Sequence, residues 1–254
     1  MKHIRFSVIA ITSLLALSAF SPLTEPPEHA AHWGYEGEGG PEHWGDLDPA
    51  FGTCSTGQMQ SPINIESFAK ISHQRLDFHY QPSSLKVVHN GHTIQANYDA
   101  GSFISMNGER YELLQLHFHS PSENTKEGKH ATMEMHLVHK SDAGLLAVVG
   151  VMMNEGEHND ALNSLWDAMP MHKSEEASIE ATINAMDLLP TTGAHYTFMG
   201  SLTTPPCSEG VHWNVMAEPI NIGMSQAQKF LSAVGENARP VQPLNGRTLA
   251  ITQN

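Results

Sequence analysis

The chain has 254 residues, with 13 Lys or Arg against 27 Asp or Glu, so its formal net charge is −14 when the histidines are neutral. A surface this acidic excludes nucleic acid as a natural partner. The length admits one large all-β domain or two small ones. We expect one domain, because no interior linker or internal repeat interrupts the chain.

The first residues have the layout of a secretory signal peptide. Lys2 and Arg5 precede an apolar run from Phe6 to Phe20, and small side chains near its end offer cleavage sites. The run is short for a membrane-spanning helix, although a retained anchor is the alternative. We therefore expect a signal peptide over residues 1–20, cleaved between residues 18 and 24, and a periplasmic or secreted chain with no membrane span. The mature chain keeps 13 − 2 = 11 basic residues, for a net charge of 11 − 27 = −16.

The segment after the signal peptide, residues 24–50, is rich in Gly, Pro, Glu and His, which indicates an irregular arm held by its few aromatic residues. Cys54 follows this arm, and Cys207 is the only other cysteine. Export places both in an oxidising compartment, where a disulfide is favoured. Two unrelated thiols are the alternative.

The middle of the chain alternates short apolar runs with turn sequences such as Asn90-Gly91 and Asn107-Gly108. Because Asn-Gly pairs favour tight hairpins, this spacing predicts a large, mostly antiparallel sheet and a mainly β fold. The expected strands are Leu85–His89, Thr93–Tyr98, Phe103–Met106, Tyr111–His119, Met133–His139 and Leu145–Met153.

Few helices are expected. Apolar residues recur at helical spacing from Leu162 to Met169 and stop at Pro170. Ser225 and Gln228 resemble a capping box at the start of a second helix that Gly235 closes.

Two of the expected strands carry histidines whose spacing decides which face of the sheet they lie on. In a strand, residues two apart share a face, so His117 and His119 lie together, while His136 shares a face with Glu134 and Val138. His139 points the other way. If these strands are neighbours, they bring three imidazoles together. Three histidine ligands suit zinc and leave its fourth tetrahedral position open, as in catalytic zinc sites.

A ligating histidine normally donates its other ring N–H to a carboxylate or carbonyl, and Gln115 and Glu134 are placed to accept. Two alternatives stay open on spacing alone. In the first, the His-x-His pattern is a coincidence in a chain with 17 histidines. His117, His119 and Glu123 also fit the ligand set of a cupin-type iron or manganese oxygenase.

Several stretches together resemble the alpha-class carbonic anhydrase family, from about His32 to Ile251. They are His32-Trp33-Gly34-Tyr35, Gly40-Pro41-Glu42-His43-Trp44, Gln60-Ser61-Pro62-Ile63-Asn64-Ile65, Asn90-Gly91-His92, His117-Phe118-His119, Glu134 to His139, and Gly200-Ser201-Leu202-Thr203-Thr204-Pro205-Pro206. The resemblance implies one domain over residues 30–254, built around a large twisted sheet with a few short helices. It also implies the Cys54–Cys207 disulfide common in exported members.

By this resemblance, His117, His119 and His136 match the zinc ligands. Thr203 matches the hydroxyl that accepts a hydrogen bond from zinc-bound hydroxide, and Glu123 matches the carboxylate that takes the Thr203 proton. His92 matches the proton shuttle. The water path beside it matches Tyr35, Asn90 and Gln95, where Gln95 departs from the Asn frequent in the family. The carbon dioxide pocket matches Val138, Val148, Leu202, Thr203, Thr204, Val211 and Trp213.

The resemblance implies a zinc-dependent carbonate dehydratase, a lyase of one-carbon metabolism, acting on carbon dioxide and bicarbonate. It is also compatible with a homodimer. A non-enzymatic zinc-binding module of the same family is the remaining alternative, although every position named above is present.

Overall fold

The structure, a computed structural model, describes residues 31–66 and 70–252. The predicted signal peptide and its cleavage sites lie outside the described residues. Within the described part of the chain, no helix is long and apolar enough to cross a membrane.

Strands dominate the fold. They are β1 (Asn64–Ile65), β2 (Lys70–Ser72), β3 (Leu76–His79), β4 (Ser83–His89), β5 (Ile94–Asn97), β6 (Phe103–Met106), β7 (Glu109–His119), β8 (Thr125–Lys126), β9 (Lys129–His130), β10 (Met133–Ser141), β11 (Leu146–Gly156), β12 (Glu176–Ile183), β13 (His195–Ser201), β14 (Glu209–Met216), β15 (Ile220–Gly223) and β16 (Ala250–Thr252). Each of the strands expected from the sequence is present within a few residues of its expected bounds.

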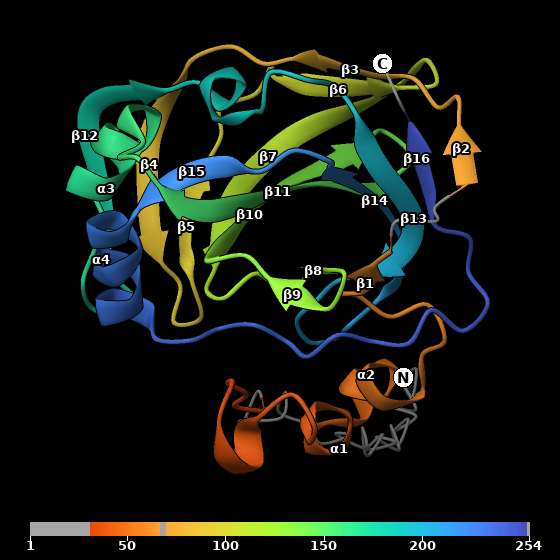
Figure 1. Cartoon of the computed structure of the whole chain (residues 1–254). Coiled ribbons are helices and arrows are strands. Elements are labelled where there is room, and N and C mark those ends of the chain that lie inside the picture. Colours follow the sequence, from red (N-terminus) through yellow and green to blue (C-terminus); the bar gives the residue numbers. More distant parts are fainter. Residues whose placement is uncertain (1–30, 67–69, 253–254) are drawn as a thin grey trace, which may run out of the picture. The chain divides into compact units, whose positions relative to one another are not determined.

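The strands β12, β4, β5, β7, β10, β11, β14, β13, β16 and β2 follow one another across a large twisted sheet (Figure 1). Most neighbours are antiparallel, while β14 and β15 both run parallel to β11, and β2 runs parallel to β16. The predicted mainly β, mostly antiparallel fold is confirmed. A two-residue turn at Asn107 and Gly108 joins β6 to β7; both residues have positive φ, as the Asn-Gly sequence predicts.

Helices are short. They are η1 (Gly37–Gly39), α1 (Trp44–Leu47), η2 (Pro49–Phe51), α2 (Thr53–Thr56), η3 (Asp160–Leu162), α3 (Asn163–Asp167), η4 (Ala185–Leu188) and α4 (Met224–Val234). The helical spacing from Leu162 to Met169 becomes a 3-10 turn followed by α3, with its apolar side chains buried.

The predicted capping box at Ser225 and Gln228 is wrong. The N-cap of helix α4 is Gly223, two residues before Ser225, and the side chain of Gln226 accepts a hydrogen bond from the Gly223 N–H at 3.1 Å. Gly223 has extended backbone and no side chain, so the reciprocal half of the box is absent. The predicted end is confirmed, because Gly235 has φ 83° and its N–H donates to the Leu231 carbonyl.

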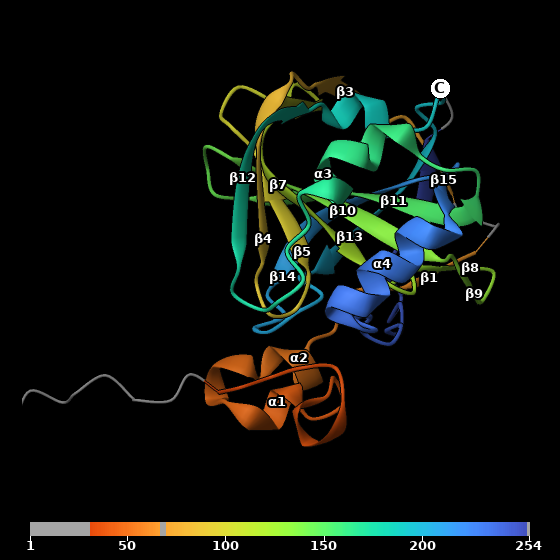
Figure 2. The same ribbon diagram turned by 90° about the vertical axis from the view of Figure 1, so that its left-hand side faces the viewer.

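The two faces of the central strands have different neighbours. Leu116 and Phe118 of β7 belong to the larger apolar cluster, which α3 and α4 help to cover; Phe118 lies 5.0 Å from the Trp166 ring of α3. Figure 2 shows both helices on this side of the strands. Val148 of β11 and Trp213 of β14 belong to a second cluster. The alternate residues of β7, including His117 and His119, therefore face away from the helices.

Candidate metal centre

Three histidines meet between β7 and β10. The two strands are antiparallel, and their register sets His136 directly opposite His117, with His119 two residues further along the same face. One ring nitrogen of each lies within 4.8 Å of those of the other two. His119 and His136 are buried, and His117 is half-buried. The convergence predicted from a period of two is thus present in the structure.

Each imidazole is held through its other nitrogen. Nδ1 of His117 lies 2.8 Å from Gln115 Oε1, and Nδ1 of His119 lies 2.8 Å from the carbonyl oxygen of Asn237. Nε2 of His136 lies 3.1 Å from Glu134 Oε1. Gln115 and Asn237 accept hydrogen bonds from Nδ1 of His117 and Nδ1 of His119, while the Glu134 carboxylate is an ion-pair neighbour of Nε2 of His136. This arrangement leaves Nε2 of His117, Nε2 of His119 and Nδ1 of His136 free to ligate.

The electrostatics of the three histidines suit a bound cation. Burial lowers the pKa of His117, His119 and His136, and for His117 and His136 the neighbouring imidazoles lower it further. Neutral imidazoles are the form that ligates metal. Nε2 of His119 is buried and has no hydrogen-bond partner among the described residues, a costly state that a bound metal ion would relieve. The residues present therefore fit a divalent metal with nitrogen ligands.

Glu134 is itself held in place. Asn124 donates to both of its carboxylate oxygens, from the backbone N–H at 2.8 Å and from Nδ2 at 2.7 Å. The pKa of Glu134 is raised by burial, which these hydrogen bonds oppose. Gly150 of β11, opposite His136, makes room for the carboxylate, because a Cβ there would lie 2.9 Å from Glu134 Oε1.

Glu123 and Thr203 come from different loops and meet beside the triad. Oε2 of Glu123 lies 3.5 Å from His119 Nε2, and its Oε1 accepts the backbone N–H of Arg239 at 2.9 Å. Burial raises the pKa of Glu123 to about 8, against the lowering effect of a side-chain hydrogen bond with Thr203. Both side chains are buried. A cation bound by the three histidines would favour the ionised, carboxylate form of Glu123.

An apolar wall adjoins the triad. Trp213 lies 4.9 Å from the His136 ring, nearly perpendicular to it. Thr204 follows Thr203 in the loop between β13 and β14 and is half-buried. The other predicted pocket residues pack in the same apolar cluster as Trp213; they are Val138, Val148, Leu202 and Val211.

His92 lies outside the triad, on the turn between β4 and β5. Asn90 shapes this turn, because its Oδ1 accepts the backbone N–H groups of His92 and Thr93. The half-buried His92 ring stacks on Trp33 at 3.6 Å between centroids. Its pKa is lowered, first by burial and then by the positive charges of Lys173 and neighbouring histidines.

A cavity of about 510 Å³ opens beside His92. Tyr35 and Asn90 line it, as expected for the predicted water path, and burial raises the pKa of Tyr35 well above its usual value. Gln95 contacts Asn90 Nδ2 at 3.4 Å, but its own amide donates to Asn97 at 2.7 Å. Gln95 also pairs with His117 across β5 and β7, so it lies between the turn that carries His92 and the triad.

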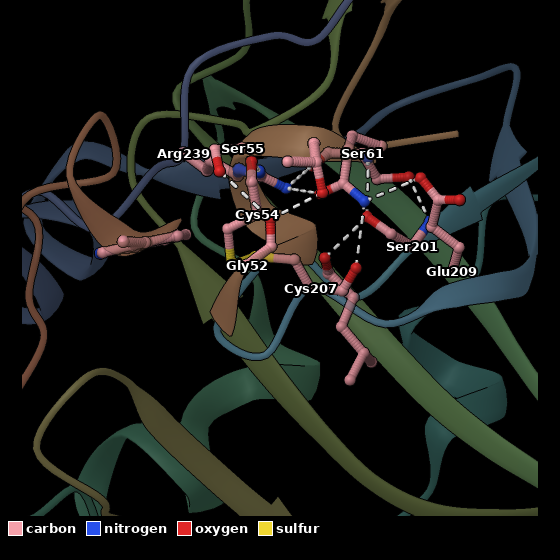
Figure 3. Close-up of a disulfide and its surroundings, with 12 residues drawn as sticks. Gly52, Cys54, Ser55, Ser61, Ser201, Cys207, Glu209 and Arg239 are labelled. Carbon is pink, nitrogen blue, oxygen red and sulfur yellow. Dashed lines mark hydrogen bonds between the residues drawn. A yellow bond between two sulfur atoms is a disulfide. The ribbon is translucent and has the colours of Figure 1, made fainter. Parts of the chain in front are cut away.

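Cys54 and Cys207 form a disulfide, as predicted, across a sequence separation of 153 residues. It ties α2 to the loop that carries Thr203 (Figure 3). The alternative of two unrelated thiols is wrong.

Comparisons with known proteins identify the family of this chain. Residues 39–253 match the family model of the eukaryotic-type carbonic anhydrases. The chain belongs to this family. A carbonic anhydrase of Klebsiella pneumoniae is 47% identical over 240 residues, which is 93% of this chain and 96% of that protein. One of Neisseria gonorrhoeae is 44% identical over 238 residues, 93% of each chain.

Among solved structures, the alpha carbonic anhydrase of Thermovibrio ammonificans, in complex with the inhibitor sulfanilamide, has a TM-score of 0.85 and 42% identity, covering 89% of this chain and 100% of that one. Family membership confirms the predicted enzyme class, a carbonate dehydratase, which is a lyase. The cupin alternative is wrong, since the matched fold is that of carbonic anhydrases.

Sequence reasoning missed three contributors to this carbonic anhydrase site: Trp33 against His92, Asn237 behind His119, and Arg239 behind Glu123. Trp33 lies in the His32-Trp33-Gly34-Tyr35 motif, but no spacing rule pairs it with His92. Asn237 and Arg239 act through backbone groups in a segment without regular structure. Backbone groups carry no residue-type pattern, so the sequence held nothing that could have identified them.

Proposed function

We propose that this chain hydrates carbon dioxide reversibly at a zinc ion held by His117, His119 and His136. The observation that carries the proposal is the triad itself, with ligand atoms within 4.8 Å of one another and the remaining ring nitrogen of each histidine within 3.1 Å of a protein oxygen. Zinc in such a site lowers the pKa of a bound water toward neutrality, as is already known for carbonic anhydrases, and so provides a nucleophile at neutral pH.

Thr203 and Glu123 orient the reaction in this proposal. The Thr203 hydroxyl donates its proton to the Glu123 carboxylate, which leaves Thr203 Oγ1 able only to accept a hydrogen bond from the attacking oxygen. That constraint aligns the nucleophile with carbon dioxide held against the wall formed by Val138, Val148 and Trp213. The apolar wall suits an uncharged linear substrate better than its charged product.

His92 relays the proton that each turnover releases. Its half-buried position beside a cavity open to solvent suits a group that takes a proton from an interior water and passes it to buffer. Tyr35, Asn90 and Gln95 would order the intervening water. We further propose that the domain spans residues 30–254 and acts in the periplasm or outside the cell, following the predicted signal peptide.

The test is stopped-flow hydration of carbon dioxide by the mature protein, before and after chelation and again with zinc restored. We expect fast hydration that disappears with the metal and returns with zinc. One bound zinc per chain without hydration would instead favour the non-enzymatic zinc-binding module. Iron or manganese as the bound metal would contradict the zinc assignment.

A further inference from the structure

Arg239 is a buried cation. Its side chain is 2% exposed, and burial lowers its pKa to about 10. Within residues 31–66 and 70–252, no carboxylate lies within ion-pair distance of the guanidinium; its Nε has no hydrogen-bond partner. The Glu123 carboxylate, beyond ion-pair distance, raises the pKa of Arg239 and so offsets part of this burial. Burying a charge without a direct ion pair is costly, so other contacts must compensate for the rest.

The guanidinium is held by neutral acceptors from one stretch of chain. Its Nη1 donates to Gln60 Oε1 at 2.9 Å and to the Ser61 carbonyl at 2.8 Å, and its Nη2 donates to the Cys54 carbonyl at 2.9 Å. Trp44 lies 5.6 Å from the charge. Figure 3 shows the guanidinium reaching into this stretch beside the disulfide. Arg239 thus anchors its own segment to residues 54–61.

That segment supports the candidate active site. The Arg239 N–H donates to Glu123 Oε1 at 2.9 Å, and two residues earlier the Asn237 carbonyl accepts from His119 at 2.8 Å. The segment follows α4 without joining any helix or strand. No sheet ladder fixes its position. A backbone hydrogen bond from Asn237 to the Ser120 carbonyl at 3.0 Å and the side chains of Asn237 and Arg239 hold it instead.

The other end of the anchor reaches the Thr203 loop. Cys54 is bonded to Cys207, whose N–H donates to the Thr204 carbonyl at 2.9 Å. Gln60, which accepts from Arg239, also donates to the Cys207 carbonyl at 3.0 Å. Cys54 and Gln60, which accept hydrogen bonds from Arg239, therefore also bind the loop that carries Thr203.

We infer that the Arg239 guanidinium is a positioning residue that holds Glu123 in register with Thr203. Glu123 and Thr203 arise from separate loops, and Arg239 joins them through its backbone N–H on one side and residues 54–61 on the other. The inference rests on the proposed function, because it concerns the pair that orients the nucleophile. A displacement of about 1 Å in such a pair costs up to about 100-fold in rate.

The first test is Arg239→Met, which keeps an unbranched side chain but removes every donor. We expect kcat/KM for carbon dioxide hydration to fall by about 10- to 100-fold, with one zinc per chain retained and no recovery in imidazole buffer. Arg239→Lys keeps the charge and can reach part of the acceptor set, so we expect a smaller loss. If Arg239→Met does not fold, Arg239→Lys carries the test.

Arg247→Met is the matched control. Arg247 also donates to backbone carbonyls, among them Gln60 at 2.8 Å and Met199 at 2.9 Å, so it braces the same region. It has no hydrogen bond to Glu123 among the described residues. We expect a lower melting temperature and a kcat/KM within about twofold of the wild type.

A double-mutant cycle with Glu123→Gln separates positioning from general destabilisation. If Arg239 acts through Glu123, its substitution should cost no more than about twofold in the Glu123→Gln background. An undiminished loss there, or a kcat/KM within about twofold of the wild type in folded Arg239 variants, would overturn the inference. An inactive wild-type protein would instead refute the proposed function itself, and Glu123→Gln with full activity would refute the orienting role of Glu123 on which the inference depends.

Discussion

The metal centre combines two regions of different construction. His117, His119 and His136 lie on the long strands β7 and β10, where a continuous ladder sets each side chain. Glu123 and Thr203 lie in loops whose positions depend on a few hydrogen bonds and one disulfide. The strand region can hold a metal through regular geometry alone, whereas in the proposed function the loop region orients the nucleophile. Substitutions in the two regions should therefore fail in different ways.

The largest effect is expected in the strand region. His119→Ala removes a ligand whose Nε2 is buried beside the other two imidazoles, so tight zinc binding and hydration should both be lost. Metal analysis after dialysis checks this, with the exposed His130→Ala as control. Stoichiometric zinc in His119→Ala would remove that residue from the ligand set.

Thr203→Ala tests the loop region at its most direct point. Zinc should stay bound, because no ligand is touched, while kcat/KM falls by about 100-fold through loss of orientation. Thr203→Ser keeps the hydroxyl and should retain most of the activity. Full turnover in Thr203→Ala, measured by stopped-flow hydration, would contradict the role of the loop.

His92→Ala should have a smaller and separable effect. At low buffer concentration we expect kcat to fall by about tenfold, while kcat/KM is nearly unchanged because the hydration step is untouched. Added imidazole should restore part of the loss by carrying the proton itself. If imidazole restores nothing, a different group shuttles the proton.

The effect expected to be smallest near neutral pH is on stability, and it concerns the opposite face of β10. His139 is buried, its Nε2 lies 2.8 Å from the Tyr80 hydroxyl, and burial lowers its pKa to about 3 while backbone hydrogen bonds to Ala147 and Leu137 oppose the shift. Below the unfolded pKa of about 6.5, the unfolded chain binds a proton that the folded chain does not. This histidine's contribution should therefore be complete above pH 6.5 and fall by about 1.4 kcal/mol per pH unit toward pH 3.

His139→Gln removes this proton and should flatten the pH dependence of the unfolding free energy between pH 6 and 4 by up to one proton. Tyr80→Phe keeps the buried histidine and should retain the slope. Denaturant melts at several pH values give the comparison. Equal slopes in His139→Gln and the wild type would show that His139 does not cause the loss of stability in acid.

Local sequence was enough for the sheet and the triad. A period of two along Gln115 to His119 and Glu134 to His139 determines which side chains share a face, and this does not depend on the rest of the chain. The Asn107-Gly108 turn follows from its own residues for the same reason. The start of α4 could not be predicted in this way. The Gln226 side chain accepts from the Gly223 N–H there, whereas the local pattern favoured a cap by the Ser225 hydroxyl.

The roles of Glu123, Thr203 and His92 were expected only from the family resemblance, since each is an ordinary polar residue in its local context. Tertiary structure alone decided what supports them. Asn237 and Arg239 reach His119 and Glu123 through backbone groups, from more than a hundred residues away in sequence. Local sequence encodes periodicity and turns, whereas contacts of this kind exist only once the whole chain has packed.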